Sequence, residues 1–266
     1  MRFPLRLSAD LILAQLAQKL RGPAGVPPVL YLDSVEHPEP SGRVAGKSPA
    51  KTNAGTDLLA CVRSAAAPVV WIGGEDPLLH PEMGQLTRCI AGIGRHVFLE
   101  TDGALLRRRI HEFRPVSRLF VTIQLNGFEE SHDLRAGRSG SFRAAVEGIR
   151  VATLSGFLLC VHARIHSATN LKEIAGLIQF ALTLGVDGFV ISPANAVSDT
   201  ANRDPRTLHG KTLKARKLIG NSSWERFSSL VESALNGESS SRQSAVETDR
   251  SIARAGNTKQ EGVRTT

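Results

Sequence analysis

The feature that most constrains the fold is a regular alternation of two sequence patterns between Pro28 and Pro193. Short runs rich in β-branched residues, typical of strands, occupy Val29–Asp33, Val69–Gly73, His96–Glu100, Leu119–Leu125, Leu158–Ile165 and Gly188–Ser192. Segments of helical periodicity lie near Asp57–Ala66, Glu82–Ile93, Ala104–Glu112, Phe142–Leu154 and Leu171–Leu184. Strict alternation implies parallel strands joined by right-handed crossovers. We therefore predict an α/β fold, a partial (β/α)6 TIM-like barrel, with a doubly wound sheet as the alternative.

Local signals support these boundaries. Residues suited to the helix N-cap precede three of the helical segments: Thr56, Ser141 and Asn170. Glycines suited to the position after a helix follow three of them: Gly94, Gly156 and Gly185. The sequence thus predicts where these helices begin and end.

The segments outside this alternation differ in composition. We expect an amphipathic helix in residues 1–27, the barrel in 28–195, a basic helical extension in 196–236 and a disordered tail in 237–266. Residues 34–55, an irregular loop after the first strand, are rich in Pro, Gly, Ser and Lys. In the first helix Ser8 is the expected N-cap, and the largely apolar stripe comprises Leu11, Ile12, Gln15, Leu16 and Leu20. This helix is expected to pack on the barrel, with peripheral membrane contact through a basic rim as the alternative.

Charge and cysteine content narrow the function classes. The net charge of +8 arises from residues 1–21 and 203–217 and is not interleaved with aromatic residues, so no nucleic-acid partner is expected. No apolar run reaches the length of a membrane span. The three cysteines, Cys61, Cys89 and Cys160, are too scattered for a disulfide framework or a local metal motif. A cytoplasmic location is therefore expected, and the oligomeric state stays open.

Polar residues recur at every second position of the predicted strands. Those expected to face the barrel axis are Tyr31, Asp33, His96, Glu100, Thr122, Gln124, Asn126, Cys160, His162, Arg164 and His166, with Phe98 among them. A barrel interior is normally apolar. This pattern therefore favours a solvated cavity for a small ligand near the carboxyl ends of the strands, with mutually hydrogen-bonded polar pairs as the alternative. His162 and His166 could ligate a metal ion with Glu100 or Asp33, but on a straight strand they lie roughly 13 Å apart, too far to share one ion unless the strand bends there.

Other chemistries can be tested against the same strands. No predicted strand contains a lysine, which argues against a Schiff-base enzyme, and there is no GxSxG motif of a serine hydrolase. Trp71 is expected in the core, and Arg107, Arg108 and Arg109 on a solvated helix face rather than in an anion site.

The most distinctive motif is VVWIGGEDPLLHPEM, which follows the second predicted strand. Consecutive glycines Gly73 and Gly74 allow a backbone to approach a ligand closely, and Glu75 places a carboxylate suited to an ammonium group. Pro81 is expected to begin the next helix. A turn that binds nothing is the alternative.

In their order, these motifs resemble the radical S-adenosylmethionine (SAM) superfamily. GGEDPLLHPE resembles the family's GGEPLLHPE loop, Thr101-Asp102-Gly103 its TNG, and VTIQLNG from Val121 its VSLDG stretch. Glu129, His132-Asp133 and Arg135 resemble its ETHDRIRG segment. Matches continue through Gly140-Ser141-Phe142, Gly185-Val186-Asp187-Gly188 and Ser192-Pro193. The resemblance covers about residues 28–195, and the N-terminal segment looks most like the hopanoid-related adenosyl hopene transferases. It implies SAM contacts from Gly73, Gly74, Glu75, Thr101, Asp102, Gln124, Asn126 and Ser192.

The family also implies a [4Fe–4S] cluster held by CxxxCxxC after the first strand, but residues 34–55 contain no cysteine. Asp76 interrupts the usual GGEP, and Asn126 replaces the usual Asp. We therefore expect a divergent barrel without a metal site that has lost the cluster, a ligand-binding or accessory protein that takes SAM or a lipid-like molecule. The sequence assigns no catalytic residue. An active hopanoid or lipid enzyme that transfers a 5′-deoxyadenosyl group is the alternative, and a degenerate gene product the third interpretation.

Overall fold

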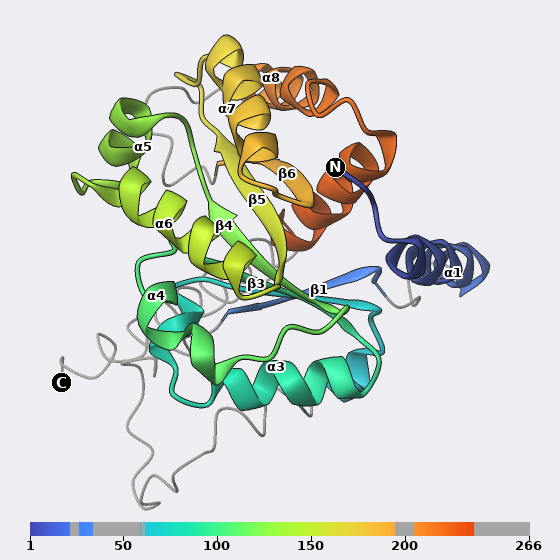
Figure 1. Cartoon of the computed structure of the whole chain (residues 1–266). Helices are drawn as coiled ribbons and strands as arrows, with labels where there is room; N and C mark the ends of the chain where they lie inside the picture. The colour runs from blue at the N-terminus through green and yellow to red at the C-terminus, as the bar shows by residue number, and fades with distance from the viewer. Residues whose placement is uncertain (22–26, 34–58, 60–61, 195–204, 237–266) are drawn as a thin grey trace, which may run out of the picture.

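The computed structural model describes residues 1–21, 27–33, 59, 62–194 and 205–236, and these contain one six-stranded parallel sheet. The strands are β1 (Val29–Asp33), β2 (Val69–Gly73), β3 (His96–Thr101), β4 (Leu119–Gln124), β5 (Leu158–Ile165) and β6 (Gly188–Pro193). Each strand pairs with the next in the order β1-β2-β3-β4-β5-β6. A doubly wound sheet would reverse its strand order. The fold is therefore the predicted partial (β/α)6 barrel, whose strands curl behind an outer layer of helices (Figure 1).

The labelled helices are α1 (Leu5–Arg21), η2 (Pro77–Leu79), α3 (Met83–Gly92), α4 (Leu106–Arg109), η3 (Ile110–Glu112), α5 (Glu129–Ala136), α6 (Ser141–Leu154), α7 (Leu171–Thr183) and α8 (Pro205–Lys217). Residues 222–236 form a further helix, called the C-terminal helix below. The expected helix 104–112 is split into α4 and the tighter η3, and α5 was not predicted. Of the expected helix 57–66, the described residues 59 and 62–65 are helical.

Some capping predictions hold and others are wrong. The Asn170 carboxamide accepts a hydrogen bond from the Lys172 N–H at 2.9 Å, as an N-cap should. Ser141 is the first helical residue of α6 rather than its N-cap, because the Asp133 carboxylate already accepts from the Gly140 and Phe142 N–H groups. Ser8 lies inside α1.

At the other helix ends, the three expected glycines Gly94, Gly156 and Gly185 all adopt a positive φ. Pro81 precedes α3 by two residues instead of beginning it, because the chain first turns through η2. The expected cap Thr56, the loop 34–55 and the tail 237–266 lie outside the described residues.

A layer of stacked aromatic side chains fills part of the barrel interior. Trp71, Phe98 and Phe120 occupy one register row of β2, β3 and β4, and their rings stack with centroids 5.4 and 4.5 Å apart. Phe227 of the C-terminal helix covers this row, 4.9 Å from Phe98. Trp71 is fully buried, which confirms its prediction as a core residue.

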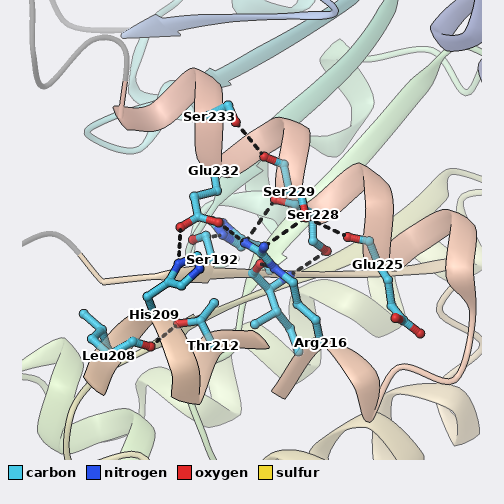
Figure 2. Close-up of polar contacts among 12 residues, drawn as sticks. Ser192, Leu208, His209, Thr212, Arg216, Glu225, Ser228, Ser229, Glu232 and Ser233 are labelled. Carbon is cyan, nitrogen blue, oxygen red and sulfur yellow. Dashed lines mark hydrogen bonds and ion pairs between the residues drawn. The ribbon is translucent and has the colours of Figure 1, made fainter. Parts of the chain in front are cut away.

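The C-terminal helix is fastened to β6. At Gly188 a side chain would have its Cβ 2.2 Å from the Trp224 ring, so only glycine admits that indole. The Arg216 guanidinium on α8 donates to the Ile191 carbonyl oxygen at 2.9 Å and to Glu232 of the C-terminal helix at 2.5 Å. Figure 2 shows this cluster, in which Arg216 joins α8, β6 and the C-terminal helix.

Helix α1 packs at the opposite end of the strands from the motifs described above. Leu7 and Leu11 are buried against the domain. The Asp10 carboxylate lies 2.9 Å from His96 Nε2, at the start of β3, and accepts from Arg118 at 3.2 Å. Within the described residues, no helix combines the length and apolarity needed to cross a bilayer.

Candidate functional site at the carboxyl ends of the strands

Glu100, on β3, is the centre of a buried polar network inside the barrel. One of its carboxylate oxygens accepts from Trp71 Nε1 at 2.7 Å. The other lies 2.6 Å from Gln124 Nε2, 2.8 Å from His162 Nδ1 and 3.0 Å from Arg164. Three strands, β2, β4 and β5, therefore direct polar groups at one carboxylate that is only 2% exposed.

This environment keeps Glu100 ionised. Burial alone would raise its pKa, but the charges of Arg164 and His162, with hydrogen bonds from His162 and Trp71, hold the pKa of Glu100 well below its usual range. The second ring nitrogen of His162 lies 2.8 Å from Ser192 Oγ on β6. The network thus extends as a chain of contacts from Trp71 to Ser192.

These contacts confirm the predicted inward orientation for Glu100, Gln124, His162 and Arg164. Most of the polar groups are satisfied by one another, as the alternative of hydrogen-bonded pairs anticipated. An exception among the described residues is the hydroxyl of Thr122, which is buried on β4 and has no hydrogen-bond partner. The polar interior is therefore partly a structural network and leaves one hydroxyl for a ligand or water.

The glycines after β2 are packed against polar side chains. A Cβ at Gly73 would lie 2.9 Å from a Glu100 oxygen and 3.0 Å from the Tyr31 hydroxyl. At Gly74, whose φ is +98°, a Cβ would lie 1.9 Å from an Asp33 oxygen. No larger residue fits there, so glycine is what lets Tyr31, Asp33 and Glu100 pack against this turn. Gly74 and Glu75 are exposed.

Asp76, the residue that interrupts the usual motif, has a structural role. Its carboxylate caps η2 by accepting from the Leu78 N–H at 3.0 Å, and it accepts from the Thr101 hydroxyl at 3.0 Å. Burial, reinforced by the charge of Asp102, raises the pKa of Asp76 to about 6 although these hydrogen bonds lower it. The loop after β2 is thereby tied to the end of β3.

Arg109 holds the same loop from the other side. Its guanidinium donates to the carbonyl oxygens of Leu78 and His80 and is paired with Glu112. The prediction of a solvated arginine face is therefore wrong for Arg109, whose guanidinium holds this loop in place. Arg107 does lie on the surface, in an exposed ion pair with Glu147.

Asn126, which replaces the usual aspartate, links β4 to β5. Its side-chain oxygen accepts from the Arg164 N–H at 2.9 Å, and its own N–H donates to His132 Nδ1 at 3.2 Å. An amide oxygen can accept the first bond as a carboxylate would, so the contact to β5 survives without the negative charge.

The structure places the eight predicted SAM-contact residues in four groups. Gln124 and Ser192 belong to the Glu100 network. Thr101 and Asp102 stand with Asp76 at the end of β3, where Asp102 pairs with Arg138 at 3.0 Å. Asn126 lies between β4 and β5, and the Gly73–Glu75 turn extends from β2. All lie at the carboxyl ends of parallel strands, where open α/β folds bind ligands.

The set predicted from the sequence omitted Glu100, His162 and Arg164 as site residues. A signal for them existed, because each is an ionisable residue that interrupts an apolar strand at an inward position. The sequence could not indicate that they share one hydrogen-bond network, since that depends on the stagger between strands.

The residues present do not fit the iron–sulfur cluster that the resemblance implies. Cys160 is fully buried on β5, where burial raises the pKa of its thiol, and Cys89 is half-buried on α3. In the described ranges, no three His, Cys, Asp or Glu side chains are grouped so as to hold a metal ion. Cys61 lies outside those ranges, and the sequence of residues 34–55 holds no thiol.

Comparisons with known proteins agree with the motif order. Residues 54–181 match the family model described as Radical SAM superfamily. The AdoMet-dependent heme synthase of Methanosarcina barkeri is 32% identical over 127 residues, 47% of this chain and 36% of that protein. The Fe-coproporphyrin III synthase of the same organism is 24% identical over 129 residues, 48% of this chain and 32% of that protein.

Among solved structures, SuiB of Streptococcus suis is similar with a TM-score of 0.48 and 13% identity, over 59% of this chain and 39% of that one. The chain spans about a third of the length of the two curated relatives. It carries a radical SAM superfamily domain. Those relatives are named as tetrapyrrole synthases, so they give no specific support to the hopanoid-related branch.

Proposed function

We propose that this barrel binds a small ligand at the carboxyl ends of its strands without assembling the family's [4Fe–4S] cluster. One observation carries the proposal: the glycine turn and its polar surroundings are intact, whereas the loop sequence that should supply three thiolates has none. The protein is then a ligand-binding or accessory member of its superfamily.

S-adenosylmethionine is the ligand that this surface favours. The Glu75 carboxylate suits the ammonium group of an amino acid, and the adjacent Gly73–Gly74 backbone, packed against Glu100, Tyr31 and Asp33, adds N–H and C=O groups at the same turn. Thr101, Asp102, Gln124, Asn126 and Ser192 are the remaining proposed contacts. In the family the cluster supplies the electron that cleaves SAM, and the residues described here provide no thiolate set for that chemistry.

Calorimetric titration tests this proposal. We expect SAM to bind the wild-type chain and Glu75→Ala to weaken binding about tenfold, because a charge-assisted hydrogen bond is lost. Glu82→Ala is the matched control, since Glu82 is an exposed carboxylate in the same loop whose side chain caps nothing. No heat with the wild-type chain, or equal affinities for wild type and Glu75→Ala, would overturn the assignment.

An active radical SAM enzyme is the second candidate, and the names of the two curated relatives favour it. Such an enzyme would act on a tetrapyrrole or, in the form expected from the hopanoid resemblance, transfer a 5′-deoxyadenosyl group to a lipid. It needs cluster ligands from a partner or from an unrecognised site. Release of 5′-deoxyadenosine from SAM under a strong reductant would establish this candidate, and our proposal predicts none.

A further inference from the structure

Helix α1 carries two opposite apolar faces, and only one of them is covered by the described residues. Leu7 and Leu11 are buried, as noted above. Five of the fourteen large hydrophobic residues that are exposed in the described ranges also lie on this helix. They are Leu5 (86% exposed), Ile12 (54%), Leu13 (65%), Leu16 (51%) and Leu20 (87%). These five are called the outer face below.

The outer face is a continuous stripe. At about 100° per residue, its five side chains fall within an arc of roughly 100°, nearly opposite Leu7 and Leu11. Figure 1 shows α1 at the periphery of the molecule, so this stripe lies outside the barrel. Contiguous apolar patches on the exposed surface of a folded protein mark interaction sites.

Among residues 1–20, the charged side chains that do not contact the barrel residues His96 and Arg118 have one sign. Asp10, the only acidic residue of α1, points toward the barrel and contacts His96 and Arg118. Arg2, Arg6 and Lys19 are exposed and basic. An apolar stripe flanked by cations suits a surface that is apolar inside and anionic at its boundary.

Other occupants fit less well. A two-fold pairing of α1 with a second copy would bring Arg2 and Arg6 against Lys19 or against themselves, and one helix about 26 Å long offers little of the roughly 800 Å² that a stable partner buries. The sequence of residues 237–266 contains three large aliphatic residues, Val246, Ile252 and Val263. That segment is therefore poorly suited to cover the stripe.

We propose that α1 is a peripheral membrane-binding helix whose outer face inserts into an anionic bilayer surface. Arg2, Arg6 and Lys19 contact the lipid head groups, while Leu7, Leu11 and Asp10 hold the barrel on the helix. Asp10 meets the amino-terminal ends of β3 and β4. The candidate site at the other strand ends therefore faces away from the bilayer.

Flotation of the full chain with vesicles tests the proposal. We expect binding to vesicles of phosphatidylcholine mixed with phosphatidylglycerol, weaker binding to phosphatidylcholine alone, and loss of this difference at high salt. The double variant Leu13→Gln/Leu16→Gln should lower the vesicle partition coefficient about tenfold, because two inserted side chains become polar. Both residues are exposed, so circular dichroism should show an unchanged fold.

The matched control is Leu134→Gln/Leu154→Gln, which alters two leucines that are 81% and 88% exposed on α5 and α6. This control should bind vesicles like the wild-type chain. Absence of binding to the anionic vesicles, or equal loss in the control, would overturn the proposal. A dimer in light scattering that Leu13→Gln/Leu16→Gln dissociates would also overturn it in favour of a second copy.

Discussion

Asp76 departs from the usual motif, and the fold accommodates it by giving its carboxylate hydrogen-bond partners. Its carboxylate caps η2 and accepts from Thr101, so the loop keeps a defined path despite the interruption. The arrangement carries an electrostatic cost, since burial raises the pKa of Asp76 to about 6. A carboxyl group with a raised pKa stabilises the fold when protonated and loses that contribution as the pH rises through the folded-state pKa.

We therefore predict that the effect of Asp76→Asn on the free energy of unfolding becomes more stabilising as the pH rises. Its stability relative to the wild-type chain should increase by about 2 kcal/mol between pH 4 and pH 7.5, after discounting for partial exposure. Urea unfolding at the two pH values measures this change. Asp133→Asn should change little between these two pH values, because hydrogen bonds from the Phe142 and Gly140 N–H groups hold the pKa of Asp133 low and its contribution is lost only at more acidic pH. A pH-independent difference for Asp76→Asn would contradict the account.

For single residues, the sequence predicted the direction in which a side chain points better than the groups with which it forms hydrogen bonds. Alternation along the strands correctly turned Glu100, His162 and Gln124 toward the barrel axis. It could not show that Trp71 donates to Glu100, because an indole in an apolar run looks like core, and it is core as well. The sequence also did not indicate that Arg109, one of three consecutive arginines, donates hydrogen bonds to a neighbouring loop.

Among the elements, the C-terminal helix depends most on a single ion pair. Arg216 is 4% exposed and joins the Ile191 carbonyl oxygen, Glu232 and Ser229. Removing one partner of a buried pair leaves the other charge uncompensated. Because this helix also places Phe227 and Trp224 over the aromatic layer, the pair connects α8 to the core.

We expect Arg216→Met to lower the free energy of unfolding by about 3 kcal/mol, and the double variant Arg216→Met/Glu232→Leu to recover part of that loss. Arg107→Met is the matched control, because it breaks an exposed pair with Glu147 and should change stability by no more than about 0.5 kcal/mol. Urea unfolding of the three variants provides the comparison. Similar losses for Arg216→Met and Arg107→Met would refute the structural role of Arg216.

Elements with strong periodicity were predicted best. All six strands lie where the apolar runs occur, because a buried parallel strand must be apolar over most of its length. Helix α5 was missed because its sequence, EESHDLRA, buries only His132 and has no apolar stripe. The helix expected over 104–112 is divided because its last turn tightens into η3, where Glu112 pairs with Arg109.

In the whole molecule, we propose different roles for the two ends of the barrel. The strand ends with Gly73, Glu100 and Ser192 form the candidate ligand site. The opposite ends receive α1, whose outer face is proposed to meet a membrane. The motif order indicated the first end, whereas which face of α1 is buried and which is exposed depends on how the helix docks, and the sequence left that open.

The distribution of cysteines is the fact on which the proposed function depends most. Cys89 lies on α3 and Cys160 on β5, Cys61 precedes Cys89 by 28 residues in the sequence, and residues 34–55 contain no cysteine. Quantification of iron and sulfide after anaerobic reconstitution of the full chain tests this directly. We predict neither ion above background and no charge-transfer absorbance near 400 nm. About four iron and four sulfide per chain would contradict this prediction and establish a cluster site.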